Sequence, residues 1–324
     1  MYLPETYGGA VLMMFVTMIC WGSWANMTKI DKEWRFELFY WDYAIGVFLM
    51  SLIFGVTLGS FGGSGMGFFP NLMHASLNVI LKAFLSGVIF NLANILLVGA
   101  ISIAGMAVAF PVGIGIAVVA GTLLSYFVHP EGNAFVLFIG VLLILLAVIL
   151  DGIAYKRAGI SVQSSGKGIT IAIISGVLMS LFYPLIAEAM IERRGLNPYG
   201  AVFFFSFGLL LSNFIINALF MKRPLVGGQL TAHDYFKGTN KQHAYGIIGG
   251  VIWCVGMTFN VIAATHAGPA IAYAFGQGAT LIAAIWGVFI WREFKEGKNV
   301  SSLLLFMFIA YVLGLLAIGI SKLS

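Results

Sequence analysis

One carboxylate, that of Asp42 in the segment FYWDYAIG, lies more than one helical turn inside an apolar stretch. Ionisable side chains are costly at such depth and are functional candidates by default. We expect Asp42 to bind hydroxyl or amide groups of a substrate, or to carry a proton. The alternative is a structural carboxylate near the headgroups, paired with Lys29 or Arg35.

A second polar pair, Tyr273 and Gln277, is spaced four residues apart and so shares one helical face. Gly276 and Gly278 flank Gln277 and allow a ligand or another backbone to approach closely. Because a glutamine amide both donates and accepts hydrogen bonds, this site suits a neutral polar ligand. Contact with another helix is the alternative.

Aromatic and amide side chains recur in other apolar stretches. Trp21 and Trp24 in WGSW, and Tyr183 in SLFYP, are suited to stacking on a planar or sugar-like molecule, with aromatic packing between helices as the alternative. Asn94 shares a helical face with Asn91. It is expected either to line a polar cavity or to bond to a neighbouring helix.

The remaining reactive residue types do not form a catalytic pattern. Asp151 and Glu188 lie near the ends of apolar stretches, where solvated or ion-paired roles are expected. All five histidines, His243 among them, fall in loops or at the edges of apolar stretches, and the sequence has no H-E-x-x-H motif. Cys20 and Cys254 read as buried hydrophobes. We therefore expect neither an enzyme, nor a metal site, nor a cofactor.

The elements that carry these residues must be membrane helices. Hydrophobic residues make up 60% of the chain and charged residues 9%, and the mean hydropathy is +1.00, whereas a soluble domain has about 25% charged residues. The net charge of +5 is spread over short loops, so no nucleic-acid partner is expected. The chain is predicted to be a polytopic membrane protein whose partner is the lipid bilayer.

A membrane-spanning helix needs about 20 apolar residues. By that rule we predict an all-α protein with ten spans. Small-residue spacings such as Gly246 and Gly250 predict close helix packing. The predicted spans are 8–29, 37–59, 76–101, 105–128, 134–154, 168–190, 199–221, 245–265, 269–291 and 301–321.

An internal repeat relates the two halves of the chain. A constant offset of 163 residues matches Gly105 with Gly268 and Gly113 with Gly276, among others. The offset pairs spans one to five with spans six to ten, and because five is odd, the second half must be inverted in the membrane. We therefore predict two five-helix inverted repeats, a fold typical of secondary transporters. The predicted divisions are 1–157, a short cytoplasmic linker 158–167, and 168–324.

The distribution of basic residues predicts the orientation. Four loops that share one side of the predicted topology hold thirteen of the 17 Lys and Arg residues. Because cytoplasmic loops carry the excess of positive charge, both termini are predicted outside. In a bacterium the location is the inner membrane.

Several motifs, in order along the chain, resemble one known family. CWGSW, WDYAIG, AGTLLSYF, MSLFYP and IWGVFIWREF are similar to the ureide permease family of the drug/metabolite transporter (DMT) superfamily, close to its glucose/ribose porters. The resemblance covers essentially the whole chain. It implies a ten-helix EamA-like transporter with proton-coupled uptake of small polar metabolites: ureides or nucleobases in the plant members, ribose or glucose in the porters. It also matches Asp42 to a carboxylate in the family's second span. The long central loop of the plant members is absent here.

These observations give one main hypothesis and two alternatives. The hypothesis is a secondary active importer of a ribose-type sugar, or of a ureide or nucleobase, working by proton symport and alternating access, with a proton gradient as its energy source. A monomer is sufficient, although a homodimer is compatible. The alternatives are an exporter of the same superfamily and a membrane sensor that binds a metabolite without moving it. The expected site comprises Asp42 for proton coupling and, for the substrate, Trp21, Trp24, Asn94, Tyr183, Tyr273 and Gln277.

Overall fold

A computed structural model describes residues 1–31, 33–159, 166–294 and 300–324. Within those residues the structure is helical and has no β-strand, and ten helical segments are long and apolar enough to cross a membrane. This confirms the predicted fold class. Most of the predicted linker 158–167 lies outside the described residues.

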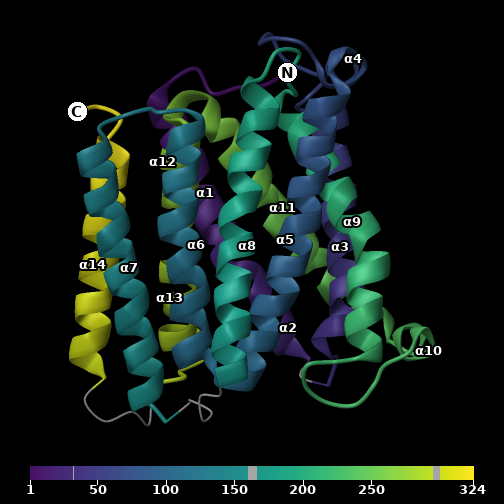
Figure 1. Cartoon of the computed structure of the whole chain (residues 1–324), viewed down its shortest axis with the longest axis vertical. Helices are drawn as coiled ribbons and strands as arrows, with labels where there is room; N and C mark the ends of the chain where they lie inside the picture. Colours follow the sequence, from purple (N-terminus) through teal and green to yellow (C-terminus); the bar gives the residue numbers. More distant parts are fainter. Residues whose placement is uncertain (32, 160–165, 295–299) are drawn as a thin grey trace. The chain divides into compact units, whose positions relative to one another are not determined.

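The elements follow one another along the chain as labelled in Figure 1. Those up to the middle of the chain are α1 (Tyr7–Ser23), η1 (Trp24–Asn26), α2 (Met27–Ile30), α3 (Phe36–Val56), α4 (Phe68–His74), α5 (Leu77–Ala104), α6 (Met106–Val128) and α7 (Ala134–Arg157). Those that follow are α8 (Gly166–Ile191), α9 (Pro198–Lys222), α10 (Ala232–Phe236), α11 (Asn240–Ala267), α12 (Pro269–Gly276), α13 (Ala279–Ile285), η2 (Trp286–Ile290) and α14 (Ser301–Ile320).

The chain forms two compact units, and each takes segments from both halves of the sequence. Unit one comprises Met1–Asn91 and Leu185–His266, and unit two comprises Leu92–Pro184 and Ala267–Ser324. The compact units are therefore not the two halves of the predicted repeat. The division into two five-helix repeats stays a prediction.

Glycine contacts hold the helices of unit one together. Helix α3 packs against α9, and a Cβ atom added to Gly46 of α3 would clash with the Ile247 carbonyl oxygen of α11. A Cβ atom on Gly250 of α11 would clash in the same way with the Tyr43 carbonyl oxygen. The close packing predicted from the glycine spacing is confirmed at Gly250.

A matching pair joins α5 to α9 in the same unit. A Cβ atom on Gly87 would clash with the carbonyl oxygen of Phe205, and one on Gly208 with the carbonyl oxygen of Phe84. Gly87 and Gly250 differ by the repeat offset of 163 residues. The two contacts therefore use equivalent positions of the repeat.

Unit two is built around α7, which packs against α14 and α6 (Figure 1). Gly140 and Gly314 allow α7 and α14 to approach closely, since a Cβ atom on Gly140 would lie 2.8 Å from the Gly314 carbonyl oxygen. Helix α12 packs against α6 and α14. Asn133 begins α7 by accepting the backbone N–H groups of Phe135 and Val136.

Two glycines at equivalent positions of the repeat have the same unusual backbone. Gly105, before α6, has φ 78° and ψ 158°, and Gly268, before α12, has φ 86° and ψ 151°. Side chains rarely adopt this conformation, which suits glycine. A single glycine thus makes each of the two very short connections that the sequence indicated.

Each unit also has a hydroxyl-to-carbonyl hydrogen bond between two of its helices. In unit one the Thr17 hydroxyl donates to the carbonyl oxygen of Gly256 at 2.9 Å. In unit two the Ser175 hydroxyl donates to the carbonyl oxygen of Ala93 at 2.8 Å. The acceptors Ala93 and Gly256 are 163 residues apart, whereas the donors Thr17 and Ser175 are 158 residues apart, so only the acceptors occupy positions matched by the offset.

The ninth span differs from the continuous helix expected over 269–291. It is divided into α12, α13 and the π-helix η2. At the first break the Gly278 N–H bonds the carbonyl of Phe275 three residues back, at 2.9 Å, instead of four back. Gln277 therefore lies at an interruption of the helix, where the flanking glycines favour a tightened turn.

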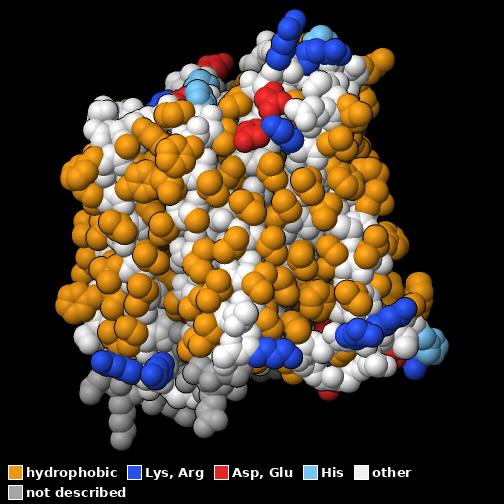
Figure 2. Space-filling view, in the orientation of Figure 1, with side chains coloured by type: hydrophobic (Ala, Val, Ile, Leu, Met, Phe, Trp, Pro, Cys, Tyr) orange, Lys and Arg blue, Asp and Glu red, His pale blue; other side chains and the backbone are white. Residues whose placement is uncertain are grey.

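Hydrophobic side chains dominate the sides of the helices on the face shown in Figure 2, whereas charged side chains gather toward the helix ends. This distribution matches a bilayer, whose core excludes charge. The protein is a multi-pass integral membrane protein.

Candidate functional site

Asp42 accepts two hydrogen bonds inside unit one. Its Oδ1 atom accepts the Tyr235 hydroxyl at 2.7 Å, and its Oδ2 atom lies 2.8 Å from Nδ1 of His243. The side chain of Asp42 is 3% exposed, whereas that of His243 is 24% exposed. The carboxylate is thus buried, and the imidazole connects it to the exterior of the unit.

Three elements position this triad. Asp42 lies in the second turn of α3, and His243 in the first turn of α11. Tyr235 comes from the short helix α10, which Thr231 and Asp234 begin with a reciprocal capping box. Gly246 of α11 leaves room for the Asp42 side chain, because a Cβ atom on Gly246 would clash with the Cβ atom of Asp42.

Aromatic rings fix the imidazole of His243. The rings of Tyr235 and Trp34 meet it edge-on, at centroid distances of 4.8 Å and 5.5 Å. Gly238 leaves space beside Nε2, since a Cβ atom there would lie 2.7 Å from that nitrogen. Such a held acid and imidazole can share one proton, either as a neutral pair or as an ion pair.

The hydroxyl of Tyr235 is a permanent donor to this carboxylate. Burial raises the pKa of Tyr235 above its ordinary value, because it disfavours the charged phenolate. The hydrogen bond to Asp42 and the negative charge of that residue raise the pKa of Tyr235 further. The hydroxyl therefore stays protonated throughout the neutral range.

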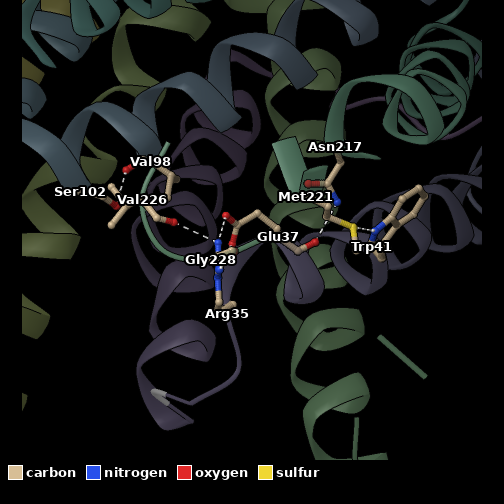
Figure 3. A network of polar contacts seen from close by, with 9 residues as sticks. All are labelled: Arg35, Glu37, Trp41, Val98, Ser102, Asn217, Met221, Val226 and Gly228. Atoms are coloured by element: carbon tan, nitrogen blue, oxygen red, sulfur yellow. Dashed lines mark hydrogen bonds and ion pairs between the residues drawn. The ribbon is translucent and has the colours of Figure 1, made fainter. Parts of the chain in front are cut away.

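Arg35 pairs with Glu37 and not with Asp42, so the predicted pairing of Asp42 with Arg35 is wrong. Its Nη2 and Nε atoms donate to the two carboxylate oxygens of Glu37, at 2.5 Å and 3.2 Å (Figure 3). It also donates to the carbonyl oxygens of Gly228 and Val226, at 2.5 Å and 3.1 Å. Arg35 thereby anchors the loop after α9 to the start of α3, which favours a structural role.

The sequence did not single out Tyr235 or His243. The His243 ring packs against Trp34 and Tyr235 and also bonds the buried carboxylate of Asp42. A histidine in the first turn of a span was the available signal. Tyr235 belongs to a loop helix, and its sequence context carried no signal of a role in this site.

Trp21 and Trp24 belong to an aromatic cluster of unit one. Trp21 stacks on Trp253, with ring centroids 5.9 Å apart, and Trp24 packs on Tyr43 at 4.8 Å. The aromatic packing offered as the alternative is therefore present. The Nε1 atom of Trp21 is buried without a hydrogen-bond partner among the described residues, so this donor is available to a ligand.

Tyr183 and Tyr273 meet in unit two, with ring centroids 5.0 Å apart. The Tyr273 hydroxyl donates to the carbonyl oxygen of Ala117 at 3.1 Å, and its ring fills the space beside Gly121. The Tyr183 hydroxyl is buried and has no partner among the described residues. Tyr273 is thus fixed against α6, and Tyr183 offers the available polar group.

Asn94 and Gln277 also belong to unit two. Asn94 is buried on α5, and Gln277 is half-buried at the end of α12. The carbonyl oxygen of Gln277 accepts the Thr280 hydroxyl at 2.9 Å. The seven predicted site residues therefore divide between the units, and their roles stay predictions. Unit one holds Trp21, Trp24 and Asp42, and unit two holds Asn94, Tyr183, Tyr273 and Gln277.

Buried amide oxygens without partners add to the polar groups of unit one. The amide of Asn217 donates to the Glu37 carbonyl oxygen at 2.8 Å (Figure 3), and that of Asn91 donates to the Ser212 hydroxyl at 2.8 Å. The amide oxygens of Asn91, Asn213 and Asn217 have no partner among the described residues. Buried acceptors of this kind favour a hydrogen-bonding ligand or water.

The two acidic residues near span ends have different surroundings. Glu188 accepts from Nζ of Lys82 at 2.6 Å, which confirms the ion-paired role expected for it. Asp151 is only 5% exposed, so the solvated role expected for it is wrong.

Comparison with known proteins identifies the relatives of this chain. The family model described as sugar transport protein matches residues 12–320. Ureide permease 1 of Arabidopsis thaliana is 24% identical, and the alignment covers 96% of each chain. The glucose uptake protein GlcU of Staphylococcus xylosus is 23% identical over 71% of this chain and 74% of its own.

Two further matches agree with these. The putative sugar uptake protein YxfA of Lactococcus lactis is 23% identical over 89% of this chain and 90% of its own. A solved crystal structure superposes with a TM-score of 0.63 over 95% of this chain and 97% of its own. At 16% identity that likeness supports the fold alone.

Proposed function

The chain belongs to the sugar transport protein family and is a transporter of small polar metabolites, and we propose that it imports its substrate together with a proton carried by Asp42. The matched relatives are permeases and uptake proteins, so the chain is a transporter and not an enzyme. The proposal adds the direction, the coupling ion and the residue that holds it.

The observation that carries the proposal is the contact between Asp42 and His243. Asp42 is buried in the second span, where an isolated negative charge is costly. A proton removes that charge, and the adjacent imidazole gives a path for the proton, because it bonds the carboxylate and is itself partly exposed. The Tyr235 hydroxyl steadies the carboxylate when the proton leaves.

The proposed substrate is neutral and polar, either a ribose-type sugar or a ureide or nucleobase. The relatives named ureide permease and glucose uptake protein support both classes. Both classes present hydroxyl, amide or carbonyl groups. The unpartnered buried donors and acceptors, such as Nε1 of Trp21, the Tyr183 hydroxyl and the Asn213 amide oxygen, suit such groups.

The proposed orientation follows from the basic loops, with both termini outside and, in a bacterium, the protein in the inner membrane. Asp42 would then lie toward the cytoplasmic end of its span, about 9 Å along α3 from Phe36. The proton gradient supplies the energy, no cofactor takes part, and alternating access moves the substrate. A monomer suffices for this cycle.

The test is uptake into proteoliposomes of labelled ribose, uracil and allantoin, with and without an inward proton gradient. Accumulation of one substrate driven by the gradient is expected of the native protein. Asp42→Asn should abolish that accumulation and retain exchange of substrate without a gradient. Glu5→Gln, which changes an exposed carboxylate, is the matched control and should behave as the native protein does.

Three outcomes would contradict the proposal. Unchanged accumulation in Asp42→Asn would remove Asp42 from coupling. Saturable binding without flux of any substrate would indicate a sensor. Movement of substrate against its own gradient, out of vesicles that contain it, while protons enter would indicate an exporter.

A further inference from the structure

Unit two contains a second buried carboxylate that the proposed mechanism does not use. Asp151 lies in α7, which forms an apolar membrane span, and it is 5% exposed. Its Oδ1 atom is buried and has no hydrogen-bond partner among the described residues. No lysine, arginine or histidine of the described chain forms an ion pair with it.

Glu293 lies near Asp151, so this is a site of two acids. Asp151 and Glu293 both lie within electrostatic reach of Tyr155. The Tyr155 hydroxyl donates to Oε2 of Glu293 at 2.7 Å. Tyr155 occupies α7 one turn after Asp151, so both side chains lie on the same side of the helix.

The turn after the ninth span brings Glu293 to this place. Its backbone N–H bonds the carbonyl oxygen of Gly287 at 2.9 Å, directly after the π-helix η2. Arg292 has φ 53°, in the left-handed region, which reverses the chain at that point. A Cβ atom on Gly287 would lie 2.8 Å from Oε2 of Glu293, so glycine leaves the space that the carboxylate occupies.

Apolar groups shield the pair. The Tyr155 ring packs on Phe294 with centroids 4.7 Å apart, in a cluster that includes Ala154 and Val300. From α14, the buried Tyr311 is the titratable group near Asp151. Lys156 and Arg157 of α7 are exposed.

The remaining helices packed against α7 bring no further charge to the site. Helix α6 has no Asp, Glu, Lys, Arg or His, and its Tyr126 lies near the opposite end of the antiparallel pair. The groups facing Asp151 within the described chain are thus Glu293, Tyr155 and Tyr311.

We propose that Asp151 is a second proton-binding residue of this protein, with Glu293 as its charged neighbour. A buried carboxylate with an unpartnered oxygen and a like charge nearby is stabilised by taking up one proton. In this step the Asp151 carboxylate takes up one proton from the aqueous solution and becomes a neutral carboxylic acid. The unpartnered Oδ1 is the atom that receives the proton. The inference stands whether or not Asp42 carries the coupling proton.

The test is infrared difference spectroscopy of the purified full chain, titrated from alkaline to acid pH in a potassium buffer. The carbonyl band of a protonated carboxyl group is expected in the native protein and in Asp42→Asn. In Asp151→Asn the component due to Asp151 is expected to be lost. Asp151→Glu is expected to restore it at a shifted frequency.

Two results would overturn the proposal. The first is a titration of Asp151→Asn identical to that of the native protein, once the melting temperature has established that the variant folds. The second is loss of the band on adding sodium chloride but not potassium chloride, because it would indicate a metal-cation site. Since the readout is protonation and not transport, failure of the Asp42 proposal leaves this result unaffected.

Discussion

The Nδ1 atom of His243 lies 2.8 Å from Oδ2 of Asp42, although 201 residues separate the two in the chain. The second span supplies the acid, and the first turn of the eighth supplies the imidazole. The loop helix α10 completes the group with the Tyr235 hydroxyl. A buried acid, a partly exposed imidazole and a permanent donor together form a compact unit for holding and releasing a proton.

The imidazole and the carboxylate are predicted to act as one unit in transport. His243→Gln keeps a side chain that can bond Asp42 but removes the imidazole as a proton carrier, so gradient-driven uptake should be lost and exchange retained. The double variant with Asp42→Asn should be no worse than either single variant, because groups that act together are strongly non-additive. Uptake and counterflow in proteoliposomes measure both properties. Additive losses would contradict the coupling of the two residues.

The phenol of Tyr235 should titrate at lower pH when Asp42 loses its charge. Burial and the neighbouring carboxylate both raise the pKa of Tyr235. In Asp42→Asn only burial remains, so the pKa of Tyr235 falls and its phenolate forms earlier on alkaline titration. Absorbance of tyrosinate measures this. Comparison with the Asp42→Asn, Tyr235→Phe double variant isolates Tyr235 from the other 11 of the 12 tyrosines. An unchanged Tyr235 titration would contradict the contact.

The glycine contact between α3 and α11 should be sensitive to a single methyl group. In Gly250→Ala the added Cβ clashes with the Tyr43 carbonyl oxygen, so the two helices must separate. We expect a destabilisation of about 1–3 kcal/mol, the usual cost of overpacking. Thermal unfolding in detergent measures it. Gly63→Ala is the control, since a Cβ atom there meets nothing within 4 Å, and equal melting temperatures for the two variants would refute the contact.

The two hydroxyl-to-carbonyl bonds between helices should contribute similar and independent free energies of unfolding. Thr17→Val in unit one and Ser175→Ala in unit two should each cost about 0.6 kcal/mol, the average for such bonds between membrane helices. The two residues share no partner, so their effects should add in the double variant. Unfolding in detergent is the measurement. Thr170→Val is the control, because its hydroxyl bonds Gly166 within one helix, and strong non-additivity would count against two separate bonds.

Features that depend on a short stretch of sequence were predictable. Ten apolar stretches gave the spans, since hydropathy depends on each stretch alone. Gly105 and Gly268, which the sequence offset matches, both have the positive φ that favours glycine. Asp42 stood out because a carboxylate at that depth is exceptional.

The partners of these residues were not predictable. Tyr235 and His243 reach Asp42 from separations of 193 and 201 residues, and no local pattern encodes a contact between a loop helix and two spans. The burial of Asp151 depends on α7 packing against α14 and α6. The position of Asp151 near the end of a span had instead indicated a solvated or ion-paired carboxylate.

The composition of unit one has a consequence for biosynthesis. Its two segments, Met1–Asn91 and Leu185–His266, are separated by most of unit two. A ribosome releases the chain from its N-terminus, so the first three spans enter the membrane long before their packing partners α9 and α11 exist. Gly46 lacks its partner until α11 has been translated, and Gly87 lacks its partner until α9 has been translated. Nascent chains stopped before α11 therefore lack part of unit one.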